Sequence, residues 1–179
     1  MHEDSGGHGL VRLATEGDLD SVADIYAAAR AFMRAHGNAA QWPDHYPTRV
    51  DAECDLALGA LWVLDEGSGP VGCMSVFDRP DRTYADIQGE TWLNDDPYWV
   101  MHRLAVAESG HGRGSALLAW LCDRHDNVRA DTHELNAPMR RALERAGFVR
   151  RGTIICDDGT PRIAYHFVRG QSLPAGGVA

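Results

Sequence analysis

Three alternating glycines carry the clearest chemical signal in this sequence. Gly110, Gly112 and Gly114 lie between a run of residues typical of a buried strand and a run typical of a helix. Glycine keeps side chains out of the way, so that successive main-chain N–H groups can face one anion. The unpaired N–H groups and the dipole of the following helix strengthen that attraction. The segment predicts an anion-binding turn or, more simply, a flexible turn before a helix.

The absence of lysine narrows the chemistry further. All 17 basic residues are arginine, which excludes a lysine Schiff base, a pyridoxal-phosphate anchor and a Walker A lysine. The glycine spacing also differs from the dinucleotide pattern, because Ser115 stands where the third glycine would be. The net charge of −9 and the lack of an arginine stripe argue against nucleic acid as a partner. An acidic surface weakly favours a cationic or neutral partner, or it only keeps the protein hydrated.

Cysteine usage and hydropathy exclude other classes. The cysteines, which form no C-x-x-C pair, are expected to be buried free thiols: Cys54, Cys73, Cys122 and Cys156. Cys122 and His125 have half of a zinc spacing, but no second pair completes it, so no metal is expected. No apolar run approaches the roughly 18 residues of a membrane span, and the start lacks the features of a signal peptide. We therefore expect a cytoplasmic protein without membrane contact.

The elements that must position the glycine turn form a mixed α/β pattern. Polar, glycine-containing tails are expected at 1–8 and 170–179, and one domain at 9–169. Apolar patterns predict strands at 10–14, 61–64, 71–77, 98–107, 128–132, 148–155 and 162–168. Helical periodicity and capping residues predict helices at 15–36, 48–58, 115–124 and 136–146. Residues 79–97 form a polar excursion without a predicted element.

This arrangement resembles the GCN5-related N-acetyltransferase (GNAT) family. The family signature, Gln/Arg-x-x-Gly-x-Gly/Ala, maps to Ser109, Gly112 and Gly114, and the stretch from Asn136 to Phe148 resembles the family's Asn-led helix ending in Gly-Phe. The resemblance covers roughly residues 10–168, and short segments are also similar to an uncharacterised bacterial subgroup. It implies a GNAT fold, with a mixed central sheet of about six to seven strands and about four helices on both faces. Family members often pair, so a homodimer is possible.

The resemblance implies that acetyl-CoA binds as co-substrate where the fourth and fifth strands splay apart. The N–H groups of the turn would hold its pyrophosphate: Ser109, Gly110, His111, Gly112, Arg113, Gly114 and Ser115. The pantetheine arm would pair with the strand residues Leu104, Ala105 and Val106, and Asn136 and Met139 would contact it from the other side. Arg113 and Arg140 either meet the phosphates of the adenosine end or only solvate the surface.

Two departures from the family pattern bear on function. Ser109 replaces the signature Gln/Arg, although main-chain N–H groups still provide the binding. Leu143 occupies the position of a tyrosine that can protonate the leaving thiolate. The leading hypothesis is an N-acetyltransferase in which an amine of a small molecule or protein attacks acetyl-CoA directly. The alternative is a non-catalytic acyl-CoA-binding or interaction module on the same fold.

Candidate catalytic and acceptor residues follow from that reaction, because an amine must lose a proton near pH 7 to attack. His102 lies two residues before Leu104, on the same strand face, and the pKa of imidazole suits a general base. The alternative interpretation is that His102 is a hydrogen-bonded structural histidine. Glu90 is the second candidate, unless it is a solvated loop charge. Trp42, Tyr46 and Trp92 either frame the acceptor pocket or fill the core.

Overall fold

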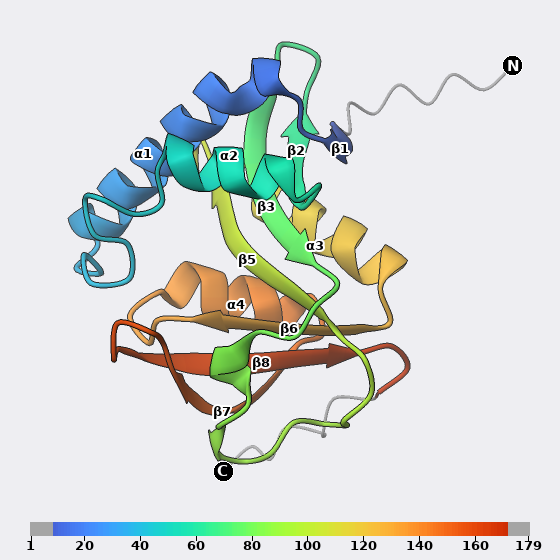
Figure 1. Ribbon diagram of the computed structural model, residues 1–179. Helices are drawn as coiled ribbons and strands as arrows, with labels where there is room; N and C mark the ends of the chain where they lie inside the picture. Colours follow the sequence, from blue (N-terminus) through green and yellow to red (C-terminus); the bar gives the residue numbers. More distant parts are fainter. Residues whose placement is uncertain (1–8, 172–179) are drawn as a thin grey trace, which may run out of the picture.

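An eight-stranded sheet runs through the protein, with its strands in the order β1-β2-β3-β5-β6-β8-β7-β4 (Figure 1). The computed structural model describes residues 9–171, so the tail expected at 1–8 and most of the tail expected at 170–179 lie outside the described residues. The strands are β1 (Leu10–Leu13), β2 (Leu61–Asp65), β3 (Pro70–Phe77), β4 (Gln88–Gly89), β5 (Trp99–Val106), β6 (Asn127–Thr132), β7 (Val149–Ile155) and β8 (Pro161–Val168). The pairing of β5 with β6 is parallel, and the other pairings are antiparallel.

The α-helices are α1 (Leu19–Ala35), α2 (Arg49–Ala57), α3 (Arg113–Arg124) and α4 (Ala137–Arg145). Thr48 and Asp51 form a capping box at the start of α2, and the Asn136 side chain accepts the Met139 N–H, 3.2 Å away, at the start of α4. In the part of the chain that the structure describes, no helix combines the length and apolarity needed to cross a membrane. The mixed sheet and its helices confirm the predicted fold class.

The strand count is higher than the predicted six to seven because of β4. This two-residue strand, Gln88–Gly89, lies in the polar excursion and pairs with β7 at the edge of the sheet. It carries no apolar alternation, so nothing in the local sequence marks it.

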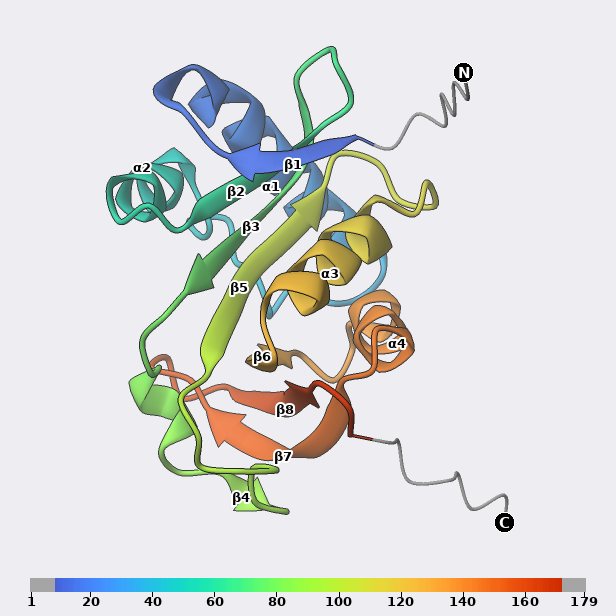
Figure 2. The same ribbon diagram turned by 90° about the vertical axis from the view of Figure 1, so that its right-hand side faces the viewer.

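Helices cover both faces of the sheet. On one face, Val63 of β2 and Cys73 of β3 pack with Val22 and Ile25 of α1. On the other face, the neighbouring strand residues pack with helices α3 and α4; this cluster includes Leu64, Met74, Leu117, Leu121 and Leu143. Figure 2 shows α3 and α4 on the same side of β5. The alternation of strand residues between two apolar clusters therefore fixes the layers.

Strands β5 and β6 splay apart, which opens the sheet between them. These strands pair only from Trp99 to Met101 on β5 and from Val128 to Ala130 on β6, whereas β5 continues to Val106 (Figure 2). From residue 102 onward, β3 is the one strand that pairs with β5 among the described residues. The parting leaves one strand edge open in the middle of the molecule.

In a third apolar cluster, Tyr84 from the polar segment 79–97 packs with Ile154 and Ala164. His166 is fully buried beside it. Its Nδ1 accepts the Leu93 N–H at 3.0 Å, and its Nε2 lies 2.6 Å from Oδ1 of Asn127. Burial is the main cause that lowers the pKa of His166 from 6.5 to about 3, and repulsion from Arg129 and Arg151 adds to it.

This buried imidazole makes stability depend on pH. Below its ordinary pKa of 6.5, the unfolded chain binds a proton at His166 that the folded chain does not bind, so stability is lost as the pH falls. At pH 5, that loss is about 2 kcal/mol relative to pH 7. When the pH is lowered from 7 to 5, we expect the free energy of unfolding of His166→Gln to fall by about 2 kcal/mol less than that of the parent protein, as measured by urea unfolding. An equal loss in both proteins would contradict the assignment.

Candidate functional site

Two cavities open where β5 parts from β6. The first, of about 790 Å³, is called the histidine cavity and is lined by His102 and by loops on either side of β5. The second, of about 660 Å³, is called the glycine cavity and is lined by the turn before α3. Both cavities share the lining residues Met33, Leu104, Asn136 and Met139. A molecule in one cavity can therefore meet a molecule in the other at these residues.

The glycine cavity brings together most of the residues predicted for acetyl-CoA binding. Its lining contains Leu104, Ala105, Val106, Ser109, Gly110, Gly112, Arg113, Gly114, Ser115, Asn136 and Met139. Apolar residues of α1, including Ala28, Ala29 and Phe32, form the facing wall. His111 and Arg140 are not part of the lining.

Main-chain N–H groups dominate the glycine end of this cavity. Gly110 and Gly112 have φ values of +91° and +73°, which glycine adopts without strain. Gly112 is the N-cap of α3, so the N–H groups that follow it, from Arg113 to Ser115, have no acceptor within the helix. These free donors and the helix dipole suit a phosphate-sized anion.

The three arginines near this cavity differ in their partners. The Arg113 guanidinium donates to both carboxylate oxygens of Glu66, at 3.0 and 2.8 Å. Arg140 instead donates to the main-chain oxygen of Glu134, at 3.1 Å, and the structure places it outside both cavities. Arg145, which the sequence reasoning missed, lines the glycine cavity. It lies seven residues after Pro138, so helical spacing on α4 is the signal for it.

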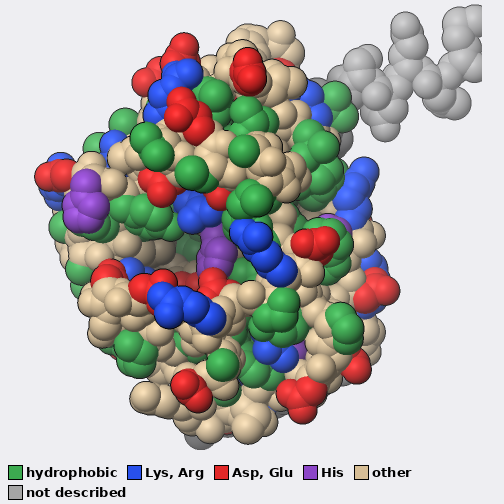
Figure 3. Space-filling view, viewed as in Figure 1, with side chains coloured by type: hydrophobic (Ala, Val, Ile, Leu, Met, Phe, Trp, Pro, Cys, Tyr) green, Lys and Arg blue, Asp and Glu red, His purple; other side chains and the backbone are tan. Residues whose placement is uncertain are grey.

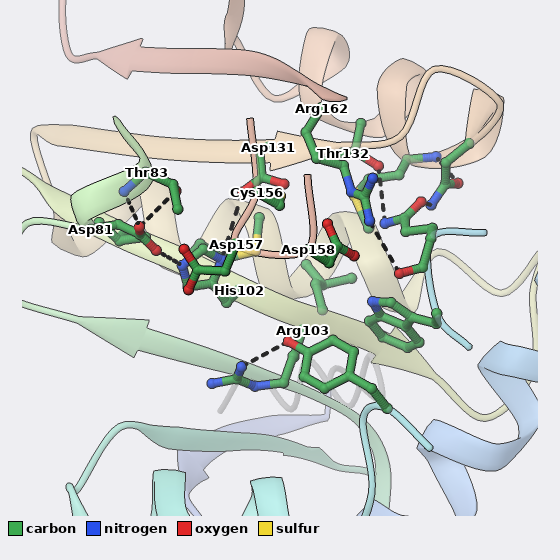
Figure 4. A pocket seen from close by; sticks show the side chains of 18 of the residues that line it. Asp81, Thr83, His102, Arg103, Asp131, Thr132, Cys156, Asp157, Asp158 and Arg162 are labelled. Carbon is green, nitrogen blue, oxygen red and sulfur yellow. Dashed lines mark hydrogen bonds and ion pairs between the residues drawn. The ribbon is translucent and has the colours of Figure 1, made fainter. Parts of the chain in front are cut away.

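The histidine cavity has an imidazole between two carboxylates. His102 Nε2 lies 2.8 Å from Oδ2 of Asp81, and Nδ1 lies 3.8 Å from Oδ2 of Asp131 (Figure 4). The hydrogen bond with His102 holds the pKa of Asp81 well below its usual value. Burial raises this pKa, but hydrogen bonds from Thr83 lower it further. The ionised Asp81 can accept a hydrogen bond from Nε2, and in the neutral tautomer that donates this bond, Nδ1 is the ring nitrogen that can accept a proton. Figure 3 shows this face hollowed, with acidic, basic and histidine side chains around the hollow.

A β-bulge at Arg103 shapes the strand beside this histidine. Cys73 pairs with Ala105 but Ser75 pairs with His102, so Met74 lies opposite two residues of β5. Arg103 has a φ of +51°, which is unusual for a residue with a side chain. The bulge interrupts the strand alternation that placed His102 and Leu104 on one face, yet both residues line the histidine cavity.

A buried ion pair fixes the bulge. The Arg103 guanidinium donates to both oxygens of Asp55, at 2.8 and 2.7 Å, and to Oη of Tyr46, at 2.9 Å. Asp55 is only 3% exposed and also accepts from the Ser75 hydroxyl. The bulge is therefore linked to α2 and to the loop before it.

The structure corrects two predictions about the cavity. Glu90 is exposed, pairs with Arg151 at 2.8 Å and lies outside both cavities, because β4 leads the chain to the far edge of the sheet. Trp92 packs on Tyr84 and His166 and also lies outside, so it fills the core. Trp42 and Tyr46 do line the histidine cavity.

Several polar residues of the histidine cavity were missed by the sequence reasoning. Asp81 comes from the polar excursion, Asp131 from the end of β6 and Arg162 from the start of β8. Gln41 accepts a hydrogen bond from the Asn136 side chain at 3.0 Å, which ties the loop after α1 to α4. Across residues 9–171, no cluster of three or more His, Cys, Asp or Glu side chains is arranged to hold a metal ion.

Comparisons with known proteins identify the family and support the fold. The model of the acetyltransferase (GNAT) family matches residues 21–148, whereas no curated protein matches the chain significantly. A GNAT-family acetyltransferase from Streptococcus agalactiae has 29% identity and a TM-score of 0.83, over 90% of this chain and 96% of that chain. Another from Listeria monocytogenes has 21% identity and a TM-score of 0.67, over 92% and 96%. Salmonella typhimurium yncA, solved with its cofactor acetyl-CoA, has 17% identity and a TM-score of 0.60, over 94% and 98%.

The Arg103–Asp55 pair yields a stability prediction. Arg103→Met leaves the buried Asp55 carboxylate without its cation, so we expect the free energy of unfolding to fall by about 3 kcal/mol. Adding Asp55→Asn removes the unpaired charge, and the double variant should lose less than the sum of the single variants. Urea unfolding of the four proteins measures this coupling. Additive losses would contradict a direct pair.

Proposed function

This chain belongs to the GNAT acetyltransferase family, and from that premise we propose that it transfers an acetyl group from acetyl-CoA to an amine. The observation that carries the proposal is the meeting of the two cavities at Met33, Leu104, Asn136 and Met139. A donor in the glycine cavity and an acceptor in the histidine cavity would have their reacting ends at this point. Direct transfer needs that proximity, because it brings the two reacting groups together without an intermediate carrier.

The glycine cavity fits acetyl-CoA by its chemistry. The N–H groups at the start of α3 would hold the diphosphate, and the open edge of β5 offers main-chain groups to the amides of the pantetheine arm. The apolar wall from α1 would cover the alkyl parts. When bound, acetyl-CoA supplies an acetyl group activated as a thioester.

His102 is the proposed general base. As the amine nitrogen bonds to the acetyl carbon and the carbon–sulfur bond breaks, Nδ1 would accept the amine proton. Asp81 would hold the ring through Nε2 and stabilise the imidazolium that forms. A main-chain N–H of β5 would stabilise the negative charge that develops on the carbonyl oxygen.

Leu143 favours the alternative of a non-catalytic acyl-CoA-binding module. The side chain at this position is fully buried in the apolar cluster beneath α3 and α4 and lines neither cavity. It cannot protonate the leaving thiolate. A thiolate is a weak enough base, with a pKa of about 8.5 for an ordinary thiol, to leave without that proton.

Turnover separates the two functions, and His102 is the residue to vary. We expect the purified protein to release free thiol from acetyl-CoA in the presence of a panel of primary amines. His102→Gln should lower kcat by about tenfold or more, because general-base catalysis typically contributes a factor of at least about 100. The affinity for acetyl-CoA, measured by calorimetry, should remain unchanged because His102 lies outside the glycine cavity.

His45→Gln is the matched control, because His45 lines the same cavity without a carboxylate pair among the described residues. It should retain most of the activity. Tight acetyl-CoA binding without thiol release for any amine would support the non-catalytic module. Equal activity of His102→Gln and the parent protein would exclude His102 as the base.

The glycine turn gives a separate prediction about the donor. Gly112→Ala places a Cβ at a φ of +73° in open space, so it costs about 1 kcal/mol of stability and intrudes only on a ligand. Gly59→Ala, at a φ of +65° and also in open space after α2, is the matched control. Both should lose similar stability, but only Gly112→Ala should weaken acetyl-CoA binding, by about tenfold. Equal affinities by calorimetry would place the diphosphate elsewhere.

A further inference from the structure

Arg162 is a buried cation in the histidine cavity with neutral partners. It is 6% exposed and lies at the second residue of β8, with its side chain extending toward the cavity (Figure 4). Its Nη1 donates to Oγ1 of Thr160 at 2.8 Å and to the Pro161 oxygen at 3.1 Å, and its Nη2 donates to the Gln41 oxygen at 3.3 Å. Within residues 9–171, no carboxylate forms an ion pair with this guanidinium.

The other arginines of this cavity are accommodated differently. Arg103 is paired with Asp55, and Arg82 is exposed and paired with Asp157 at 2.7 Å. Arg79 is exposed and lies over the Phe77 ring. Arg162 is thus the buried cavity arginine that lacks an anion. Burying a guanidinium is costly without a charged partner, and three neutral acceptors leave part of its five N–H donors available.

The lining of the cavity carries groups of both charges. Asp81 and Asp131 lie on either side of His102. Arg162 lines the same cavity from the start of β8. Asp158 is exposed, and its carboxylate accepts hydrogen bonds from the N–H and hydroxyl of Thr160; the charge of Arg162 also lowers its pKa, but no hydrogen bond joins the two side chains among the described residues. A molecule with both an amine and an anion would meet the carboxylates beside His102 through one group and Arg162 through the other.

We propose that the acceptor is an amine that also carries a carboxylate, and that Arg162 binds this carboxylate. The planar guanidinium suits two parallel hydrogen bonds to a carboxylate. The amine would then lie toward His102, and the apolar side chains of Trp42, Tyr46 and Phe77 would contact the carbon frame. The proposal rests on the proposed function, because it identifies the class of the second substrate.

The test compares amines that differ only in a carboxylate. The pairs are glycine and methylamine, 4-aminobutyrate and propylamine, and L-phenylalanine and 2-phenylethylamine, each assayed with acetyl-CoA by thiol release. We expect kcat/KM to be about tenfold or more higher for the carboxylated member of at least one pair, as a charge-assisted hydrogen bond provides. Arg162→Gln should reduce that ratio to about one. Arg82→Gln is the control, because Arg82 is exposed and already pairs with Asp157. This variant should keep the ratio.

A second measurement follows ligand binding. 3-Phenylpropionate, which has a carboxylate but no amine, should bind the parent protein in calorimetry and compete with the acceptor, whereas 3-phenylpropanamide should do neither. Acetyl transfer without preference for carboxylated amines, or a preference that survives in Arg162→Gln, overturns this proposal and leaves the proposed function intact. Failure of all amines to react contradicts the proposed function instead. In that case, binding of 3-phenylpropionate by the parent protein but not by Arg162→Gln still decides whether Arg162 holds a carboxylate.

Discussion

The parting of β5 from β6 after Met101 is the constraint on which the rest of the site depends. A strand with one unpaired edge in the middle of a sheet exposes main-chain N–H and C=O groups that need partners. Up to residue 171, where the description of the structure ends, no later strand covers this edge; the glycine turn, α1 and α4 surround it as the walls of a cavity. The fold therefore provides polar main-chain groups inside an apolar enclosure, which is what a long ligand with amide and phosphate groups requires.

The bulge at Arg103 adds a second constraint at the same place. A left-handed conformation at a residue with a side chain costs about 1–2 kcal/mol, so something else must favour it. Asp55 supplies that stabilisation through two charge-assisted hydrogen bonds in a buried setting. Because Arg103 also bonds to Tyr46, the same interaction joins β5, α2 and the loop that lines the histidine cavity. The packing of α2 and the position of His102 are thus linked through one side chain.

Local patterns in the sequence account for much of this arrangement, since capping boxes, strand alternation and the glycine turn each depend on residues close together in the chain. The residues that the sequence did not reveal depend on distant partners. Asp81 meets His102 only because the polar excursion returns to β5, and the same excursion carries Glu90 to the opposite edge. Arg140 and Arg145 lie on one helix, and only the packing of α4 decides which of them faces the cavity. The positive φ of Arg103 has no sequence signal, because a glycine would have been expected there.

The use of arginine alone as the basic residue gains a physical meaning inside these cavities. A lysine amine placed near an acetyl thioester could lose its proton when buried and become a competing nucleophile. A guanidinium stays protonated at any physiological pH, so it can hold an anion without reacting. In the proposed reaction, Arg162 in the histidine cavity, and Arg113 and Arg145 in the glycine cavity, would therefore provide positive charge without themselves accepting the acetyl group. Because the chain has no lysine at all, none of its side-chain amines could compete with the proposed acceptor.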